Sequence, residues 1–220
     1  TANTQRGITA EDYFSFEVAG YPNISPDGKL VAYVVTKIDK AQNRRNSAVW
    51  MTATDGSRTP WQFTTAPQNS TSPRWSPDGK SLAFLSSRPA EAAPATGSAP
   101  AEQPKAQIYV LSMSGGEARR ITTLKNGVSL FRWSPDGTRL AFAGHPGSTD
   151  TVLHNKLHIL YLSTGQVVAF DKPAEHDVSA VTWSADGKWL YFTPTNRTIA
   201  ELYAGAADDS SMKRGTGQPC

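Results

Sequence analysis

Serine and aspartate recur together in the chain at a spacing that could support acid–base, nucleophilic or metal chemistry. The short motif S-x-D-G occurs four times and contributes the pairs Ser25 and Asp27, Ser76 and Asp78, Ser134 and Asp136, and Ser184 and Asp186. Carboxylates bind calcium or transfer protons, and a serine hydroxyl becomes a nucleophile when a histidine activates it. No histidine stands at a recognisable spacing from these serines, or from Ser86 and Ser87, so we expect no catalytic residue in this chain.

The motif has a structural explanation that needs no chemistry. In the stretch 76–79, Ser can hydrogen-bond forward, Pro77 presets φ, Asp78 tolerates the bridge region and Gly79 accepts the left-handed conformation. This pattern predicts a type I turn followed by a left-handed glycine, a common three-residue hairpin connection. Ala185 replaces the proline in the fourth copy and is acceptable there. We therefore expect the four aspartates to shape turns and to lie far apart, one in each repeat.

The remaining candidates for metal chemistry are four histidines and one cysteine: His145, His154, His158, His176 and Cys220. His154 and His158 are four residues apart, but they flank or enter a predicted strand, where such positions are about 13 Å apart. No carboxylate lies nearby at ligand spacing, and a single cysteine allows neither an intrachain disulfide nor a thiolate zinc site. We expect no metal site and no cofactor.

A repeat of about 50 residues carries the motif. After each turn an apolar strand is predicted, at 29–35, 80–86, 138–144 and 188–194. A third strand follows at 48–53, 107–112, 157–162 and 201–205, and a fourth at 60–65, 119–124 and 166–170. The first strand of each unit ends on the motif itself. Ala32, Ala83 and Ala141 stand at one position of the second strand, where close approach of sheets requires small side chains, whereas the fourth copy has Tyr191.

Short antiparallel strands, repeated in fours and apolar on both faces, predict an all-β protein with β-propeller blades. We expect about four blades, at 20–65, 70–124, 128–170 and 178–214. An Ala/Pro/Glu-rich insertion at 88–105 is predicted to be a surface loop. Residues 1–19 form an N-terminal segment, in which Thr9 and Asp12 form a T-x-x-D capping signature for one short helix. Residues 215–220 form an anomalous tail.

Composition excludes several functional classes. Hydrophobic residues are 38% and charged residues 19%, as in a folded domain rather than a disordered polyelectrolyte. The net charge of +3 comes from scattered basic pairs, so we expect no nucleic-acid partner. Apolar runs are too short to span a membrane. The opening TANTQRG lacks an initiator Met and an apolar stretch, which favours a mature N-terminus and a periplasmic or secreted location, with the cytoplasm as the alternative.

The pattern W-S-P-D-G-K-x-[LI]-A-[FY] resembles the propeller repeats of the prolyl oligopeptidase family of serine peptidases, and also those of the periplasmic Tol-system propeller protein. The N-terminal stretch ITAEDYFSFEVAGYPNISPDGKLVAYVVTKID favours the first family. It resembles the opening of the dipeptidyl-peptidase and acylaminoacyl-peptidase branch, in which a short helix precedes a first turn reading I-S-P-D-G. Ile24, in place of tryptophan in the first copy alone, fits this branch.

The resemblance implies that these blades are part of a larger propeller of seven or eight blades. It also implies that the propeller restricts the access of short peptides to a Ser-Asp-His triad in a following α/β-hydrolase domain. The chain has no G-x-S-x-G sequence, so we expect it to be an inactive N-terminal portion of a serine exopeptidase, partnered by that missing domain. Some relatives bind a substrate amino group with propeller glutamates, but none of Glu11, Glu17, Glu117, Glu175 and Glu201 matches such a motif. The alternative is a stand-alone periplasmic propeller that acts as a binding or scaffold module.

Overall fold

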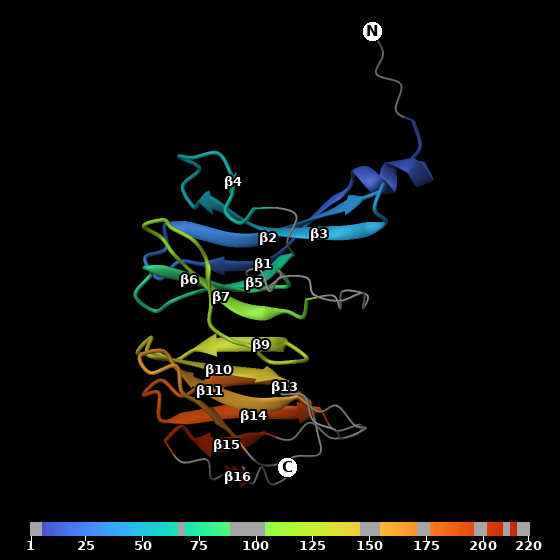
Figure 1. Cartoon of the computed structure of the whole chain (residues 1–220). Helices are drawn as coiled ribbons and strands as arrows, with labels where there is room; N and C mark the ends of the chain where they lie inside the picture. Colours follow the sequence, from blue (N-terminus) through green and yellow to red (C-terminus); the bar gives the residue numbers. More distant parts are fainter. Residues whose placement is uncertain are drawn as a thin grey trace, which may run out of the picture. The chain divides into compact units, whose positions relative to one another are not determined.

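The computed structural model of this chain is almost entirely β-structure. It describes residues 6–65, 69–88, 104–145, 155–170, 177–195, 202–208 and 212–214. Within these ranges, four antiparallel sheets have four strands each, and η1 is the one helix (Figure 1). The all-β class and the four-stranded repeating unit are thereby confirmed.

Each sheet corresponds to one sequence repeat, and we number the sheets as blades 1 to 4 along the chain. Blade 1 has β1 (Glu17–Ile24), β2 (Leu30–Asp39), β3 (Arg44–Ala53) and β4 (Trp61–Gln62). Blade 2 has β5 (Ser70–Trp75), β6 (Ser81–Ser86), β7 (Gln107–Ser112) and β8 (Arg119–Arg120). Blade 3 has β9 (Val128–Trp133), β10 (Arg139–Gly144), β11 (Lys156–Tyr161) and β12 (Val167–Ala169). Blade 4 has β13 (Asp177–Trp183), β14 (Trp189–Thr195), β15 (Tyr203–Ala206) and β16 (Met212–Arg214). Strand order within each blade follows chain order.

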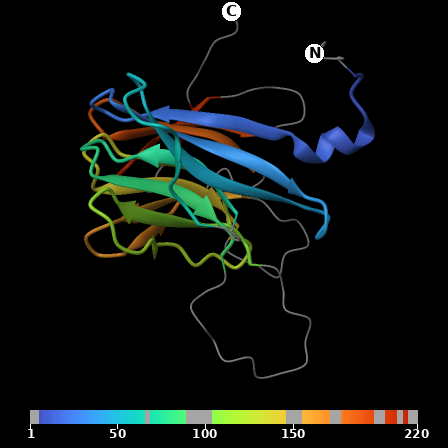
Figure 2. The ribbon, with the colours of Figure 1, turned by 90° about the horizontal axis from the view of Figure 1, so that it is seen from above.

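The chain divides into two compact units, Thr1–Pro73 and Arg74–Cys220, with the division inside β5. In the first unit, η1 (Ala10–Ser15) precedes β1. It lies beside the end of the β2–β3 hairpin at which β2 turns into β3 (Figure 2). The Thr9 amide donates to the Asp12 carboxylate over 2.7 Å, so the capping role predicted for Asp12 is observed. The Arg45 guanidinium donates to the Tyr13 hydroxyl, 3.1 Å away, and ties the helix to β3.

Blades 2, 3 and 4 pack face to face within the second unit, and two buried clusters fill the spaces between them. Ala83 and Leu85 of blade 2 pack with Phe131, Leu140 and Phe142 of blade 3. On the other face of blade 3, Ala141, Ala143, Leu157 and Ile159 pack with Val178, Val181, Leu190 and Phe192 of blade 4. β6 and β10 are thus buried on both faces, as their continuous apolar runs predicted. Alanine permits this because a larger side chain would hold the sheets apart.

At each S-x-D-G turn, four residues lie inside the last backbone hydrogen bond that joins the two strands, so the predicted three-residue connection is wrong. In blade 1 the Ser25 amide donates to the Leu30 carbonyl over 2.8 Å, which leaves 26–29 as the loop. The type I turn itself is present, since the Gly28 amide donates to the Ser25 carbonyl over 2.9 Å and Gly28 has φ of 73°. The loop gains its extra residue because side chains, in place of backbone carbonyls, accept from the amides at its C-terminal end. Asp27 accepts from the Lys29 amide and the Ser25 hydroxyl accepts from the Leu30 amide.

The outermost strands are shorter than the predicted ranges 60–65, 119–124 and 166–170. A threonine hydroxyl replaces the backbone carbonyl as the ladder acceptor in blades 1 and 2. Thr64 accepts from the Val49 amide and Thr122 from the Ile108 amide, each over 2.9 Å. Both threonines are buried. Local side-chain bonds of this kind compete with regular pairing, so the strand ends while the chain stays on the blade.

Candidate functional site

The four turn aspartates each accept two hydrogen bonds from their own turns. In each copy the aspartate accepts from the serine hydroxyl two residues before it and from the amide two residues after it, over distances of 2.5–3.1 Å. The serine hydroxyl bond is the main cause that lowers the pKa of Asp27, Asp78 and Asp186. A carboxylate held ionised by its own turn is a structural acceptor and a poor proton donor.

The serines considered as nucleophiles have structural partners. Ser76 and Ser134 are buried, and each donates its hydroxyl to its turn aspartate. Ser86 is also buried and accepts from the Arg88 Nε over 3.2 Å. The hydroxyl protons of Ser76 and Ser134 are thus directed to a carboxylate of the same turn and not to a histidine. The arrangement therefore resembles no nucleophile–base pair.

Two of the four histidines, His154 and His176, lie outside the described residues. His145 is buried and its Nδ1 is 2.9 Å from the Asn126 side-chain amide. His158 on β11 is buried with its ring stacked on Phe142 at a centroid distance of 5.0 Å, and neither ring nitrogen has a hydrogen-bond partner. Burial is the main cause that lowers the pKa of His158. His158 is thus a neutral core aromatic.

The glutamates likewise form no common site. Glu11 pairs with Lys40, and Glu17 pairs with Lys37 over 2.6 Å, both at the surface. Glu117 is exposed, whereas Glu175 and Glu201 lie outside the described residues. Among the residues that are described, no three His, Cys, Asp or Glu side chains lie close enough together to hold a metal ion. In the same ranges no helix has the length and apolarity needed to cross a membrane.

The tryptophan that opens the motif joins successive blades. The Trp133 indole Nε1 donates to the backbone carbonyl of Arg74 on blade 2 over 3.1 Å. The Trp183 indole Nε1 donates to the carbonyl of Arg132 on blade 3 over 3.3 Å. In both cases the acceptor is the residue just before the preceding blade's own tryptophan. The same geometry recurs because the same residue stands at the same place in each repeat.

Proline and glycine of successive turns also meet. A Cβ atom on Gly137 would lie 3.4 Å from Cδ of Pro77, one blade earlier, and a Cβ on Gly187 would lie 3.6 Å from Cδ of Pro135. The turns of blades 2, 3 and 4 are therefore stacked, and glycine at this position serves both the positive φ and the close approach.

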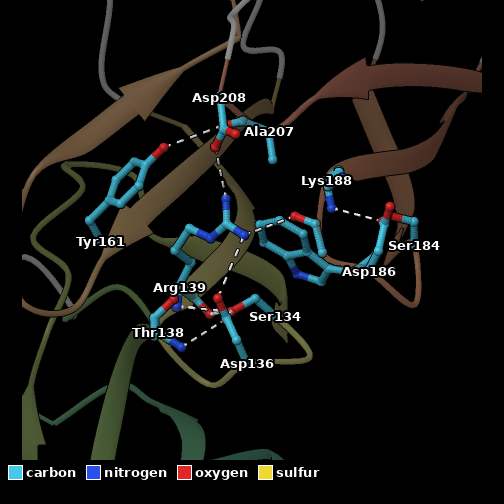
Figure 3. A network of polar contacts seen from close by, with 12 residues as sticks. Ser134, Asp136, Thr138, Arg139, Tyr161, Ser184, Asp186, Lys188, Ala207 and Asp208 are labelled. Atoms are coloured by element: carbon cyan, nitrogen blue, oxygen red, sulfur yellow. Dashed lines mark hydrogen bonds and ion pairs between the residues drawn. The ribbon is translucent and has the colours of Figure 1, made fainter.

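Arg139 of blade 3 makes polar contacts with two residues of blade 4 (Figure 3). From β10 its Nη2 donates to the Gly187 carbonyl over 2.8 Å and its Nη1 to the Asp208 carboxylate over 3.2 Å. Its guanidinium also lies 4.9 Å from the centre of the Trp183 ring. Only 12% of the side chain is exposed. The planar fork of arginine suits this site, which combines carbonyl, carboxylate and aromatic partners.

Sequence reasoning missed Arg139, because the other repeats have Leu30, Ser81 and Trp189 at its position. The one signal was that a charged residue begins a strand that is otherwise apolar. Its partners stand about 50 and 70 residues further along the chain and no local pattern identifies them. What Arg139 and its partners offer chemically is cohesion between blades, since the guanidinium is engaged by a carbonyl, a carboxylate and an aromatic ring.

Comparison with known proteins agrees with this architecture. Residues 10–158 match the family model PD40, described as a TolB beta propeller domain. The chain is 31% identical over 207 residues to the uncharacterised peptidase YuxL of Bacillus subtilis, covering 94% of this chain and 27% of that protein. It is 28% identical over 130 residues to dipeptidyl-peptidase 5 of Porphyromonas gingivalis, covering 59% of this chain and 18% of the other. The chain thus spans about a quarter or less of these relatives.

Solved structures with the same fold include both expected kinds of propeller protein. An acylaminoacyl peptidase from Pyrococcus horikoshii superposes with a TM-score of 0.65 at 20% identity, over 94% of this chain and 33% of that one. A putative TolB from Agrobacterium tumefaciens gives a TM-score of 0.64 at 23% identity, over 92% of this chain and 63% of that one. At these identities the likeness establishes the fold, and the expected resemblance to peptidase propellers is confirmed by the sequence relatives.

Proposed function

The chain belongs to the PD40 family of TolB-type β-propeller domains, and from this premise we propose that it is the N-terminal propeller portion of a serine exopeptidase. Its role is steric: it restricts the access of short peptides to an α/β-hydrolase domain that lies elsewhere in the parent protein. The observation that carries the proposal is the 31% identity to a peptidase across 94% of the chain.

The contacts between blades support a steric role. Each described interface in the second unit combines an apolar cluster with an indole-to-carbonyl bond, and the interface between blades 3 and 4 adds the Arg139 contacts. Close-packed interfaces of this kind deform little. A rigid propeller excludes large substrates by its shape alone and needs no reactive group of its own.

The N-terminal segment favours the dipeptidyl-peptidase and acylaminoacyl-peptidase branch over other serine peptidases. The short helix η1 precedes blade 1, and the first turn carries Ile24, whose side chain is 61% exposed, where the later turns carry tryptophan. The substrate that the parent protein hydrolyses would decide between dipeptidyl-peptidase and acylaminoacyl-peptidase activity. We propose a periplasmic or secreted location for the parent, with the cytoplasm as the alternative.

A second candidate is a propeller that binds or scaffolds other proteins without a hydrolase. The family description and the coverage of 63% of a TolB chain favour it. The two candidates differ in what the parent protein catalyses, so activity separates them.

The test compares the 220-residue chain with the protein encoded by its complete gene, on peptide p-nitroanilides with free and with acetylated N-termini. We expect the complete protein to hydrolyse one class, a serine-directed phosphonate to abolish that activity, and the chain alone to be inactive. The matched control is the complete protein with its G-x-S-x-G serine changed to alanine. Hydrolysis by the chain alone, or a complete protein without a G-x-S-x-G serine and without activity, would overturn the proposal.

A further inference from the structure

Exposed apolar side chains are concentrated near the start of the chain. In the part of the chain that the structure describes, eight large hydrophobic side chains are exposed, and six of them belong to residues 8–24. Their exposed fractions run from 46% to 82%. They are Ile8, Tyr13, Phe16, Val18, Tyr21 and Ile24. Single exposed hydrophobic residues need no explanation, whereas a concentration of them indicates an interaction surface.

Three of these residues form one surface at the junction of η1 and β1, which we call the N-terminal patch: Tyr13, Phe16 and Val18. The rings of Tyr13 and Phe16 meet edge to face, with their centroids 6.5 Å apart. Phe16 has extended backbone angles and Val18 follows in β1, so the side chains of these two residues project to the same side. Glu17, which lies between them, projects to the other side and pairs with Lys37.

Polar contacts attach η1 to the β2–β3 hairpin, which reverses the usual orientation of a surface helix. The Arg45 guanidinium donates to the Tyr13 hydroxyl over 3.1 Å, and Lys40 in the hairpin turn pairs with Glu11. No residue of η1 is buried. A surface helix normally turns its apolar residues toward the core and its polar residues toward solvent. The contacts with the hairpin therefore hold η1 in place without covering the N-terminal patch.

The position of the patch disfavours another blade as its cover. The blade interfaces of the second unit are formed by strand residues of the two sheets, as where Ala141 packs with Leu190. η1, in contrast, lies outside the strand order of blade 1. The greater part of the relative YuxL lies outside the 27% that this chain matches, so a partner of a different fold within the same protein is available.

We propose that the N-terminal patch is the surface on which the α/β-hydrolase domain of the parent protein packs. The identity of this partner rests on the proposed function, whereas the patch itself rests on the exposure of Tyr13, Phe16 and Val18. Apolar side chains next to surface ion pairs, here those of Glu17 and Lys40, are typical of interfaces between domains of one chain. Because the proposed steric role requires the propeller to stay on the hydrolase domain, the patch holds the two domains together.

A photoreactive side chain identifies what covers the patch. The complete protein is made with p-benzoylphenylalanine in place of Phe16, irradiated and digested, and the cross-linked peptides are identified by mass spectrometry. We expect cross-links to the part of the protein that contains G-x-S-x-G. The matched control carries the same group in place of Val167 on β12, whose exposed fraction of 47% equals that of Phe16 within one percentage point. It should give no cross-link to that part.

Hydrogen exchange of the amides of residues 10–16 measures the strength of the contact. We expect exchange to be slower by about tenfold or more in the complete protein than in the 220-residue chain, since an aromatic ring becomes buried. Phe16→Ser should return the complete protein toward the faster rate and should leave the isolated chain nearly unchanged, because the ring is exposed there. Val167→Ser is the control and should not alter exchange at 10–16 in either protein. If Phe16→Ser fails to fold, Val18→Thr keeps a β-branched side chain and should accelerate exchange by a smaller factor.

Three results would overturn the proposal: cross-links from position 16 only to another blade or to a second copy, no cross-link at all, or equal exchange at 10–16 in the chain and the complete protein. None of these readouts depends on hydrolysis. An active serine peptidase that gave any of them would refute the packing surface and leave the proposed function intact. A complete protein without G-x-S-x-G and without activity would refute the proposed function, and the cross-links would still identify what covers the patch.

Discussion

The indole Nε1 of Trp183 on blade 4 donates a hydrogen bond to the backbone carbonyl of Arg132 on blade 3, 3.3 Å away. Trp133 makes the same bond to Arg74 one blade earlier. The motif tryptophan therefore joins each of these blades to the one before it, in addition to packing beside the apolar cluster between them. This relationship gives the repeated sequence a function in assembly beyond the shape of its turn.

Replacing Trp183 by phenylalanine should lower the free energy of unfolding by about 1 kcal/mol, since it removes the indole donor and keeps most of the apolar contact. Urea unfolding followed by circular dichroism measures the change. Trp50→Phe is the control, because Trp50 packs through a cation–π contact with Lys37 and no hydrogen bond from its indole is described. Equal losses of unfolding free energy in the two variants would mean that the smaller side-chain volume, and not the lost hydrogen bond, determines the effect.

Replacing Arg139 by lysine should destabilise the chain by about 1–3 kcal/mol, although the charge is kept. A single ammonium group cannot reach the Gly187 carbonyl and the Asp208 carboxylate while also stacking on Trp183. The loss is measured by thermal and urea unfolding. Arg120→Lys, at an exposed position on β8, should change stability little. A neutral result for Arg139→Lys would show that the fork geometry is unimportant.

His158 should make the fold less stable as the pH falls below its ordinary pKa of 6.5. Its folded-state pKa is lowered, so between pH 6.5 and that lower value the unfolded chain takes up a proton that the folded chain does not, and stability decreases with falling pH. His158→Phe should remove this contribution and, by removing two unpaired buried nitrogens, raise stability at pH 7 by about 1 kcal/mol. Urea midpoints from pH 8 to 5 test both. If the urea midpoints of the original chain and of His158→Phe changed with pH in the same way, the pH dependence would not come from His158.

The turn aspartates should contribute to acid unfolding at lower pH. The pKa of Asp27, Asp78 and Asp186 is lowered in the fold, chiefly by the serine hydroxyl, so their contribution is present above pH 3.8 and is lost as the pH falls through their folded values. Asp78→Asn should therefore make stability less dependent on pH below 4, as should Ser76→Ala to a smaller extent. Thermal midpoints between pH 5 and 2 measure the slope. An unchanged slope in both variants would assign acid unfolding to other carboxylates.

Two glycines separate backbone strain from inter-turn packing. Gly28 and Gly187 have φ of 73° and 68°, so alanine should cost about 1 kcal/mol at either position. A Cβ on Gly28 meets nothing within 4 Å, whereas one on Gly187 lies 3.3 Å from Arg139 Nη2. Gly187→Ala should therefore lose more stability than Gly28→Ala, and combining it with Arg139→Lys should be less than additive. Equal losses in the two alanine variants would show that the stacked turns tolerate a methyl group.

Much of the fold was predictable from the sequence because its determinants are local. Turn type, strand position and burial on both faces depend on residues within about ten positions of one another. The motif S-x-D-G followed by an apolar run therefore predicts all three. The predictions that failed were also local, but they concerned side chains that replace backbone partners. The Ser25 hydroxyl and the Asp27 carboxylate lengthen the hairpin loop, and the Thr64 hydroxyl shortens β4.

The contacts between blades were decided by the tertiary structure alone. Arg139 bonds Gly187 and Asp208, and Trp183 bonds the carbonyl of Arg132, across 48 to 69 residues of chain. Such partners depend on how one sheet packs against the next, and the residue pattern within a strand does not predict this packing. The same holds for the unpaired nitrogens of His158. The sequence by itself determined that the chain builds blades with ionised, structural aspartates in their turns. Stacking of those blades decided which side chains meet across each interface.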